Sequence, residues 1–120
     1  MSEAYVGIDA HARTCTLGWM NAEGEYQREW TFATSQARLL RHIARIETEP
    51  KIVTVEECPL AGWVARTLDP HVSKVFVCDP RENELISTHV NKGDSQDTYA
   101  LCRLLRLGAL KEVYHSSDDD

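Results

Sequence analysis

Residues 5–9, with the sequence YVGID, form a short β-like run that ends in a carboxylate, Asp9. Residues 52–56, with the sequence IVTVE, repeat this arrangement and end in Glu56. Because aspartate and glutamate are disfavoured in strands, two apolar strands that end in acids need a physical reason. One reason is a divalent metal, since hard cations such as Mg²⁺ take several oxygen ligands, commonly carboxylates from separate elements.

A second pair of acids, Asp94 and Asp97, lies three residues apart where an amphipathic helix is expected to begin. Residues three apart share a helix face, so both carboxylates could reach the same ion. Capping is an alternative and compatible role, because Asp94 is a natural N-cap and an acid at the third helical position favours the helix dipole. If the two pairs meet in space, we expect a metal-dependent phosphodiester site. Its candidate catalytic and metal-binding residues are Asp9, Glu56, Asp94 and Asp97.

Length and composition indicate one folded domain. The chain has 120 residues, of which 42% are hydrophobic, enough to build a core. It has no run of about 18 apolar residues, so no membrane span is expected. The first residues lack the basic and apolar regions of a secretory signal, which makes a cytoplasmic protein the default expectation.

Cysteine spacing and net charge narrow the possible classes of protein. The four cysteines contain no C-x-x-C pair, so we expect reduced thiols rather than a structural zinc site. The formal net charge of −6 argues against a simple basic nucleic-acid-binding module. Residues 118–120 contribute three of the negative charges, and the proposed site would contribute four that a metal neutralises. The acidic total therefore weakens a nucleic-acid role without excluding it.

The first part of the chain predicts three antiparallel strands. Residues 4–33 contain three stretches in which apolar and polar residues alternate, and residues 21–24 (NAEG) are a turn signal between the second and third. Short loops make antiparallel hairpins the economical connection.

Helices and further strands are predicted beyond residue 33. Ser35 is expected to cap a helix, and Pro59 to occupy the first turn of another. Residues 52–56 and 72–78 are predicted strands, and residues 80–87 a short helix. Because strand–helix–strand units favour parallel strands covered by helices, we expect a mixed five-stranded α/β sheet, a three-strand antiparallel meander followed by parallel strands, with flanking helices.

Four motifs in this order resemble a known family: GID at 7–9, VE at 55–56, DPR at 79–81 and KGDSQD at 92–97. The set resembles the N-terminal domain of the DEDD transposases of bacterial insertion sequences, the "one-ten" family, whose N-terminal domain is similar to the Holliday-junction resolvase RuvC and has the ribonuclease-H-like fold. The resemblance covers about residues 5–115. It implies a RuvC-like domain over residues 4–110 and a truncated connector, residues 111–120, to a missing C-terminal domain.

The resemblance implies roles for the acids and a set of partners. It makes Asp9 the first acid, Glu56 the second, and Asp94 and Asp97 the final pair, with Mg²⁺ or Mn²⁺ as cofactor. It also implies DNA recombination guided by a structured RNA, a homodimer or larger assembly, and a nucleophilic serine in the missing domain. The chain departs from the family where ECP at 57–59 follows the second acid in place of a glycine-containing turn.

Other side chains have competing interpretations. Arg38, Arg41 and Arg45 line one side of a predicted helix and could contact phosphate, although a solvated helix face explains them as well. His11 follows Asp9 closely and could face the site, or be an ordinary surface residue. The tryptophans could stack on bases, but core packing is the simpler interpretation.

Three functional alternatives stay open. A stand-alone Holliday-junction-resolvase-like nuclease would use the same acids. A non-catalytic RNA-binding or dimerisation fragment would not cut at all. An actin-like ATPase half needs a loop rich in glycine and hydroxyl residues after the first strand, whereas residues 9–13 are DAHAR.

Overall fold

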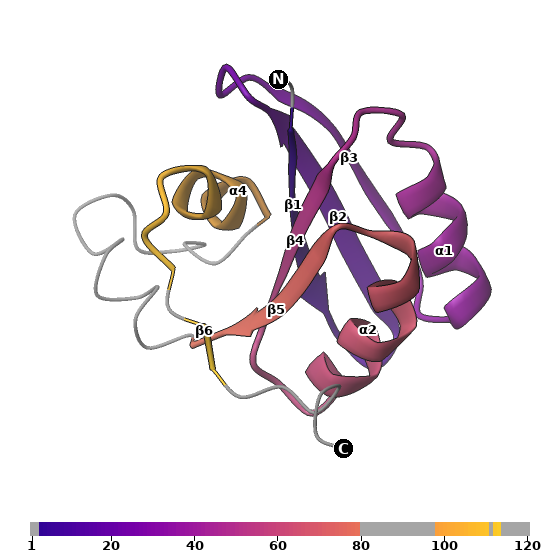
Figure 1. The fold of residues 1–120 in the computed structure, drawn as a ribbon. Coiled ribbons are helices and arrows are strands. Elements are labelled where there is room, and N and C mark those ends of the chain that lie inside the picture. The colour runs from indigo at the N-terminus through magenta and orange to yellow at the C-terminus, as the bar shows by residue number, and fades with distance from the viewer. Residues whose placement is uncertain (1–2, 80–97, 111, 114–120) are drawn as a thin grey trace.

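The structure is a computed structural model that describes residues 3–79, 98–110 and 112–113 (Figure 1). Its strands form one mixed sheet in the order β3-β2-β1-β4-β5-β6. The strands are β1 (Ala4–Ala10), β2 (Thr14–Asn21), β3 (Tyr26–Ala33), β4 (Lys51–Glu56), β5 (Lys74–Cys78) and β6 (Glu112–Val113).

The predicted five strands are present with the predicted directions. β1, β2 and β3 are antiparallel neighbours, and β4 and β5 run parallel to β1. β6 was not expected: it pairs antiparallel with β5 within the segment interpreted as a connector. Two residues are too short for an alternating pattern, so the sequence gives no signal for this strand.

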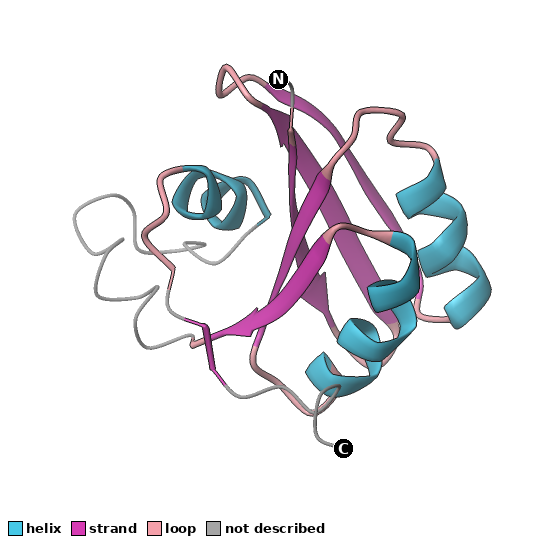
Figure 2. Cartoon of the chain, in the orientation of Figure 1, coloured by secondary structure: helices cyan, strands magenta, loops and turns pink. Residues whose placement is uncertain are grey.

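Helices lie on both faces of the sheet (Figures 1 and 2). One face is covered by α1 (Gln36–Ala44) and α2 (Ala61–Leu68), which a short 3₁₀ turn, η1 (Asp69–His71), follows. The other face is covered by α4 (Thr98–Arg106). The short helix predicted over 80–87 lies outside the described residues. Within those described, no helix is both long enough and apolar enough to span a bilayer.

Local chemistry explains where the helices begin. Ser35 caps α1 as predicted, since its Oγ accepts a hydrogen bond of 3.1 Å from the backbone N–H of Arg38. The prediction for Pro59 was wrong, because α2 begins at Ala61 and Leu60 occupies the N-cap position. Pro59 instead lies in a turn in which the N–H of Ala61 donates to the carbonyl of Cys58.

Each face of the sheet carries its own apolar core. Strand alternation sends every second side chain of β1 and β4 toward α1 and α2. Buried residues of that core include Val6, Ile8, Leu39, Ile43, Val53, Val55, Val64 and Leu68. The core under α4 is smaller and is built from Phe76, Cys78, Leu101 and Leu105.

Two glycines that face each other across β1 and β2 let α4 approach the sheet backbone. A Cβ atom at Gly7 would lie 2.8 Å from the Cβ of Leu101 and 3.0 Å from the carbonyl oxygen of Thr98. A Cβ atom at Gly18 would lie 2.0 Å from the hydroxyl oxygen of Tyr26. The first turn of α4 therefore sits where a side chain on either strand would otherwise be.

A β-bulge in β3 brings Tyr26 into contact with Thr98, the first residue of α4. Pairing between β2 and β3 shifts at Trp19 and Met20, so that Tyr26 faces α4 rather than α1. The Tyr26 hydroxyl donates to Glu29 Oε1 at 2.6 Å and lies 2.6 Å from Thr98 Oγ1. Burial and the hydrogen bond to Glu29 raise the pKa of Tyr26, so this hydroxyl keeps its proton at neutral pH.

Replacing Gly7 by alanine should destabilise the fold, because the new methyl group would meet Leu101 and the backbone of α4. We expect a loss of about 1–3 kcal/mol in the free energy of unfolding, measured by urea denaturation. Gly62→Ala is the matched control: it lies inside α2, where a Cβ would meet only the flexible end of Arg66, so it should be neutral or stabilising. Equal stability of Gly7→Ala and the parent would show that α4 does not pack this closely.

Candidate metal-binding site

Asp9 and Glu56 lie at the same edge and on the same face of the sheet. β1 and β4 are parallel, and the last residues paired between them are Ile8 and Val55. Asp9 and Glu56 are the next residues of the two strands. Because alternation places Asp9 on the face of Gly7, and Gly7 pairs with Thr54 of β4, both acids belong to the face that α4 covers.

An open pocket of about 340 Å³ lies at this edge. Its walls are the ends of β1 and β4 and the turns that follow them, residues 9–12 and 56–60. Asp9 is 34% exposed, so its carboxylate can reach solvent and a solute in the pocket. The sequence prediction that these two acids approach each other is consistent with this shared pocket.

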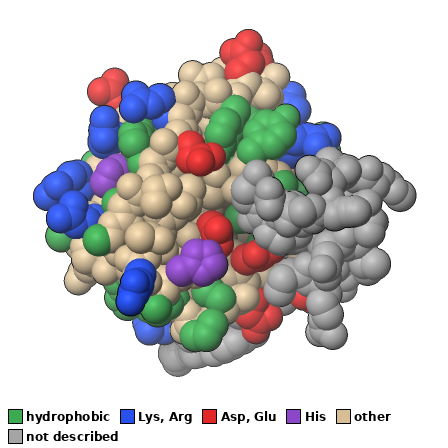
Figure 3. Space-filling view, turned by 180° about the vertical axis from the view of Figure 1, so that it is seen from behind, with side chains coloured by type: hydrophobic (Ala, Val, Ile, Leu, Met, Phe, Trp, Pro, Cys, Tyr) green, Lys and Arg blue, Asp and Glu red, His purple; other side chains and the backbone are tan. Residues whose placement is uncertain are grey.

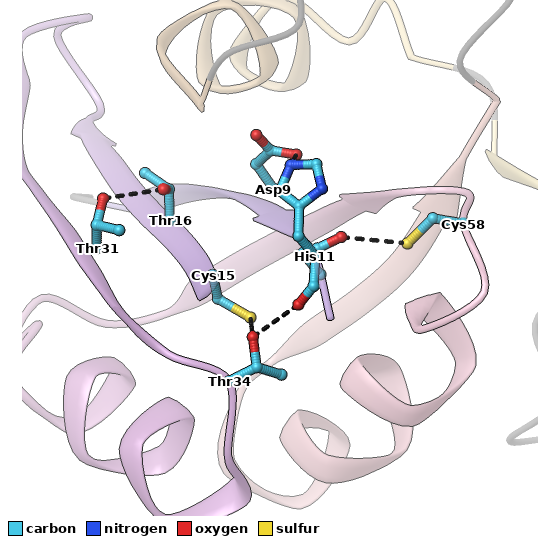
Figure 4. Close-up of polar contacts among 8 residues, drawn as sticks. Asp9, His11, Cys15, Thr16, Thr31, Thr34 and Cys58 are labelled. Carbon is cyan, nitrogen blue, oxygen red and sulfur yellow. Dashed lines mark hydrogen bonds and ion pairs between the residues drawn. The ribbon is translucent and has the colours of Figure 1, made fainter. Parts of the chain in front are cut away.

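His11 contacts Asp9 directly (Figure 4). Its Nε2 lies 3.1 Å from Asp9 Oδ1, and the ring is 67% exposed. The hairpin that carries it is held by Thr34, whose hydroxyl donates to the carbonyl of His11 at 2.7 Å and whose N–H donates to the carbonyl of Arg13. The imidazole is thus placed to orient the Asp9 carboxylate. Its position two residues after Asp9 was the only signal for this contact in the sequence.

Polar residues lie beside Asp9 on the two neighbouring antiparallel strands, β2 and β3. Asp9 pairs with Thr16 of β2, and Thr16 pairs with Thr31 of β3. The hydroxyls of Thr16 and Thr31 lie 2.9 Å apart (Figure 4). On the sheet face that α4 covers, the edge beside the pocket therefore carries a polar residue on each of four adjacent strands, β3, β2, β1 and β4. The two carboxylates belong to β1 and β4.

Glu57 follows Glu56 directly and is also an acid in the wall of the pocket. Its backbone N–H donates to the carbonyl of Cys78 at 3.0 Å, which fixes the turn after β4, and the residue is exposed. Cys58 follows with its Sγ 3.7 Å from the carbonyl oxygen of Ala10 (Figure 4). Strand alternation places Glu56 on the face of Asp9, whereas Glu57 lies beyond the end of β4, in the turn that lines the same pocket.

The start of α4 is the helix end nearer to Asp9. Thr98 lies over Gly7 and Gly18, whereas Arg106, in the last turn, donates from its Nε to the carbonyl of Ala22 at 2.9 Å. The helix therefore runs away from the pocket edge, toward the β2–β3 turn. A helix N-terminus carries partial positive charge, which favours anions near it.

The donor set present fits a hard divalent cation in part. Mg²⁺ is often held by one or two carboxylates together with water and substrate phosphates, and Asp9 and Glu56 offer two carboxylates to one pocket. No group of three or more metal-ligating side chains occurs within residues 3–79 and 98–110. Asp94 and Asp97 lie outside the described residues, so their predicted place in the site stays a prediction.

The predicted nucleic-acid contacts are not part of this pocket. Arg38, Arg41 and Arg45 belong to α1 and its C-cap, on the sheet face opposite to Asp9, and all three are exposed. The tryptophans are partly buried and pack against the core beneath α1 and α2, as the core-packing interpretation predicted.

Comparison with known proteins leaves the family open. No protein-family model and no curated protein matches the chain. The solved structure of the ethanolamine utilization protein EutJ from Carboxydothermus hydrogenoformans matches 75% of this chain and 42% of its own, at 14% identity and a TM-score of 0.47. The Aquifex aeolicus member of the Ppx/GppA family matches 69% of this chain and 37% of its own, at 12% identity and a TM-score of 0.40. The chain thus spans about two fifths of these structures, and likeness at this level adds nothing on function.

Proposed function

We propose that this chain is the N-terminal catalytic domain of a DNA transposase or recombinase with a ribonuclease-H-like fold. In this proposal Asp9, Glu56, Asp94 and Asp97 hold Mg²⁺ or Mn²⁺ for phosphodiester cleavage and strand exchange. The observation that carries the proposal is the pairing of β1 with β4, which brings Asp9 and Glu56 to one face of one open pocket. The antiparallel meander followed by parallel strands is the arrangement that the ribonuclease-H-like interpretation requires.

The chemistry expected of the site is phosphoryl transfer. Bound divalent cations stabilise the attacking and leaving oxygens of such a displacement. Asp9 and Glu56 supply anionic oxygens on a rigid sheet, and His11 orients the Asp9 carboxylate. The partial positive charge at the start of α4 favours a phosphate group on the same face.

One rival class is disfavoured by the loop after β1. An actin-like ATPase half would need glycine and hydroxyl residues there to surround phosphate. The β1–β2 connection is instead a tight hairpin of His11, Ala12 and Arg13, closed by a hydrogen bond from the N–H of His11 to the carbonyl of Thr14.

The remaining alternatives differ in what the chain does alone. A stand-alone resolvase-like nuclease nicks branched DNA in the presence of Mg²⁺ without any further domain. A non-catalytic fragment binds structured RNA or dimerises and never cuts. The proposed transposase domain binds the metal but needs the serine of a further domain for complete strand exchange. Nicking of a branched DNA by the chain alone with Mg²⁺ therefore identifies the nuclease, and metal binding separates the other two.

Asp9→Asn and Glu56→Gln should each weaken Mn²⁺ binding about tenfold or more. Each replaces an anionic carboxylate ligand by a neutral amide of similar shape. Isothermal titration calorimetry on the folded variants measures this. Glu47→Gln is the matched control, since it removes the same charge from an exposed residue outside the pocket and should leave the affinity close to that of the parent. Equal affinities for all three variants and the parent would contradict the proposed site.

Asp97→Asn should weaken Mn²⁺ binding while changing the melting temperature little. The reason is that an acid at the third helical position contributes only about 0.3–1 kcal/mol through the helix dipole, whereas asparagine is a much poorer metal ligand than aspartate. A fall in melting temperature with unchanged metal affinity would instead assign Asp97 to helix capping alone.

A further inference from the structure

Arginines that lack acidic partners gather on the side of the molecule that carries α1. Arg28 comes from β3, Arg38 and Arg41 from α1, and Arg45 is the C-cap of that helix. All four are exposed, and among the described residues none has a carboxylate within 4.0 Å. We call these four residues the α1–β3 arginine patch. Seen from behind, Lys and Arg side chains cluster along the edge where α1 lies (Figure 3).

Two of these arginines are held against an aromatic surface. The guanidinium carbon of Arg28 lies 5.3 Å, and that of Arg45 4.8 Å, from the centroid of the Trp30 ring. Such contacts fix the orientation of a guanidinium group while leaving its N–H donors available. The other polar group of Trp30, its indole Nε1, is buried and has no acceptor among the described residues.

Aromatic rings continue the surface next to Trp30. His42 lies with its ring centroid 5.6 Å from that of Trp30, and it stacks on Phe32 at 4.2 Å with an interplanar angle of 6°. Trp30 and His42 are both partly exposed. Positively charged groups interleaved with aromatic rings are the pattern by which proteins bind single-stranded nucleic acids, whose phosphates pair with arginine and whose bases stack.

Helix electrostatics explains only part of the patch. Basic residues near a helix C-terminus interact favourably with the dipole, which covers Arg41 and Arg45. Arg38 lies in the first turn, where the dipole disfavours positive charge, and α1 has no acid in that turn. Arg28 belongs to a different element. Glu29, which follows Arg28 in the sequence, hydrogen-bonds to Tyr26 on the other face of the sheet.

We propose that the α1–β3 arginine patch, together with Trp30 and His42, binds a single-stranded nucleic acid through its phosphates without a metal ion. A chain with a net charge of −6 repels a polyanion in general, so binding has to be confined to a region where positive charge is concentrated. The surface lies on the sheet face opposite to Asp9 and Glu56. Strand binding at the patch is therefore independent of the proposed metal site.

The test is fluorescence anisotropy with a labelled oligothymidylate or oligouridylate of about 16 nucleotides, in EDTA and over a range of salt concentrations. Each arginine that neutralises a phosphate should contribute about 0.7 to the slope of log affinity against log salt. The double variant Arg28→Gln, Arg45→Gln should therefore bind more weakly, with a slope lower by about 1.4. Arg45→Lys keeps the charge and should keep most of the slope.

Control measurements show whether binding occurs at the patch rather than elsewhere on the surface, and whether it depends on the metal site. Arg103→Gln removes an exposed arginine from α4, on the opposite face, and should change neither affinity nor slope. Because the assay contains EDTA, binding at the patch does not require the metal site, so a failed metal site would leave this result intact. The proposal is overturned if the parent does not bind at low salt, or if Arg103→Gln weakens binding as much as the patch variant. Stronger binding of a duplex, or equal binding of a poly-glutamate of matched charge, also overturns it.

Discussion

Parallel pairing between β1 and β4 is the constraint on which the proposed site depends. Antiparallel neighbours would put the ends of the two strands at opposite edges, whereas parallel strands bring both ends to one edge. With Ile8 opposite Val55, the next residue of each strand is an acid on the same face. The two carboxylates are then held by backbone hydrogen bonds and by the cores on both sides of the sheet rather than by a flexible loop.

The close packing of α4 depends on two glycines on the sheet face that carries the acids. Gly7 and Gly18, opposite each other, remove the side chains that would keep a helix away from the sheet. The bulge in β3 then turns Tyr26 toward Thr98, where its hydroxyl and that of Thr98 share the carboxylate of Glu29. These contacts place the start of α4, rather than its end, toward the pocket edge.

Sequence patterns predicted what depends on local chemistry and missed what depends on long-range pairing. The meander and the Ser35 cap follow from alternation and capping, and both are local. The bulge and β6 depend on where distant segments meet, which a single sequence does not show. Arg28 was missed for the same reason, because it joins the arginines of α1 only when β3 lies beside that helix.

The most direct measurement is a crystal structure of the chain grown with Mn²⁺, with anomalous scattering used to place the ion. The account predicts an anomalous peak in the pocket of residues 9–12 and 56–60, about 2.0–2.6 Å from carboxylate oxygens of Asp9 and Glu56. A structure at saturating Mn²⁺ with no peak in this pocket, or with the two carboxylates turned away from each other, would contradict it.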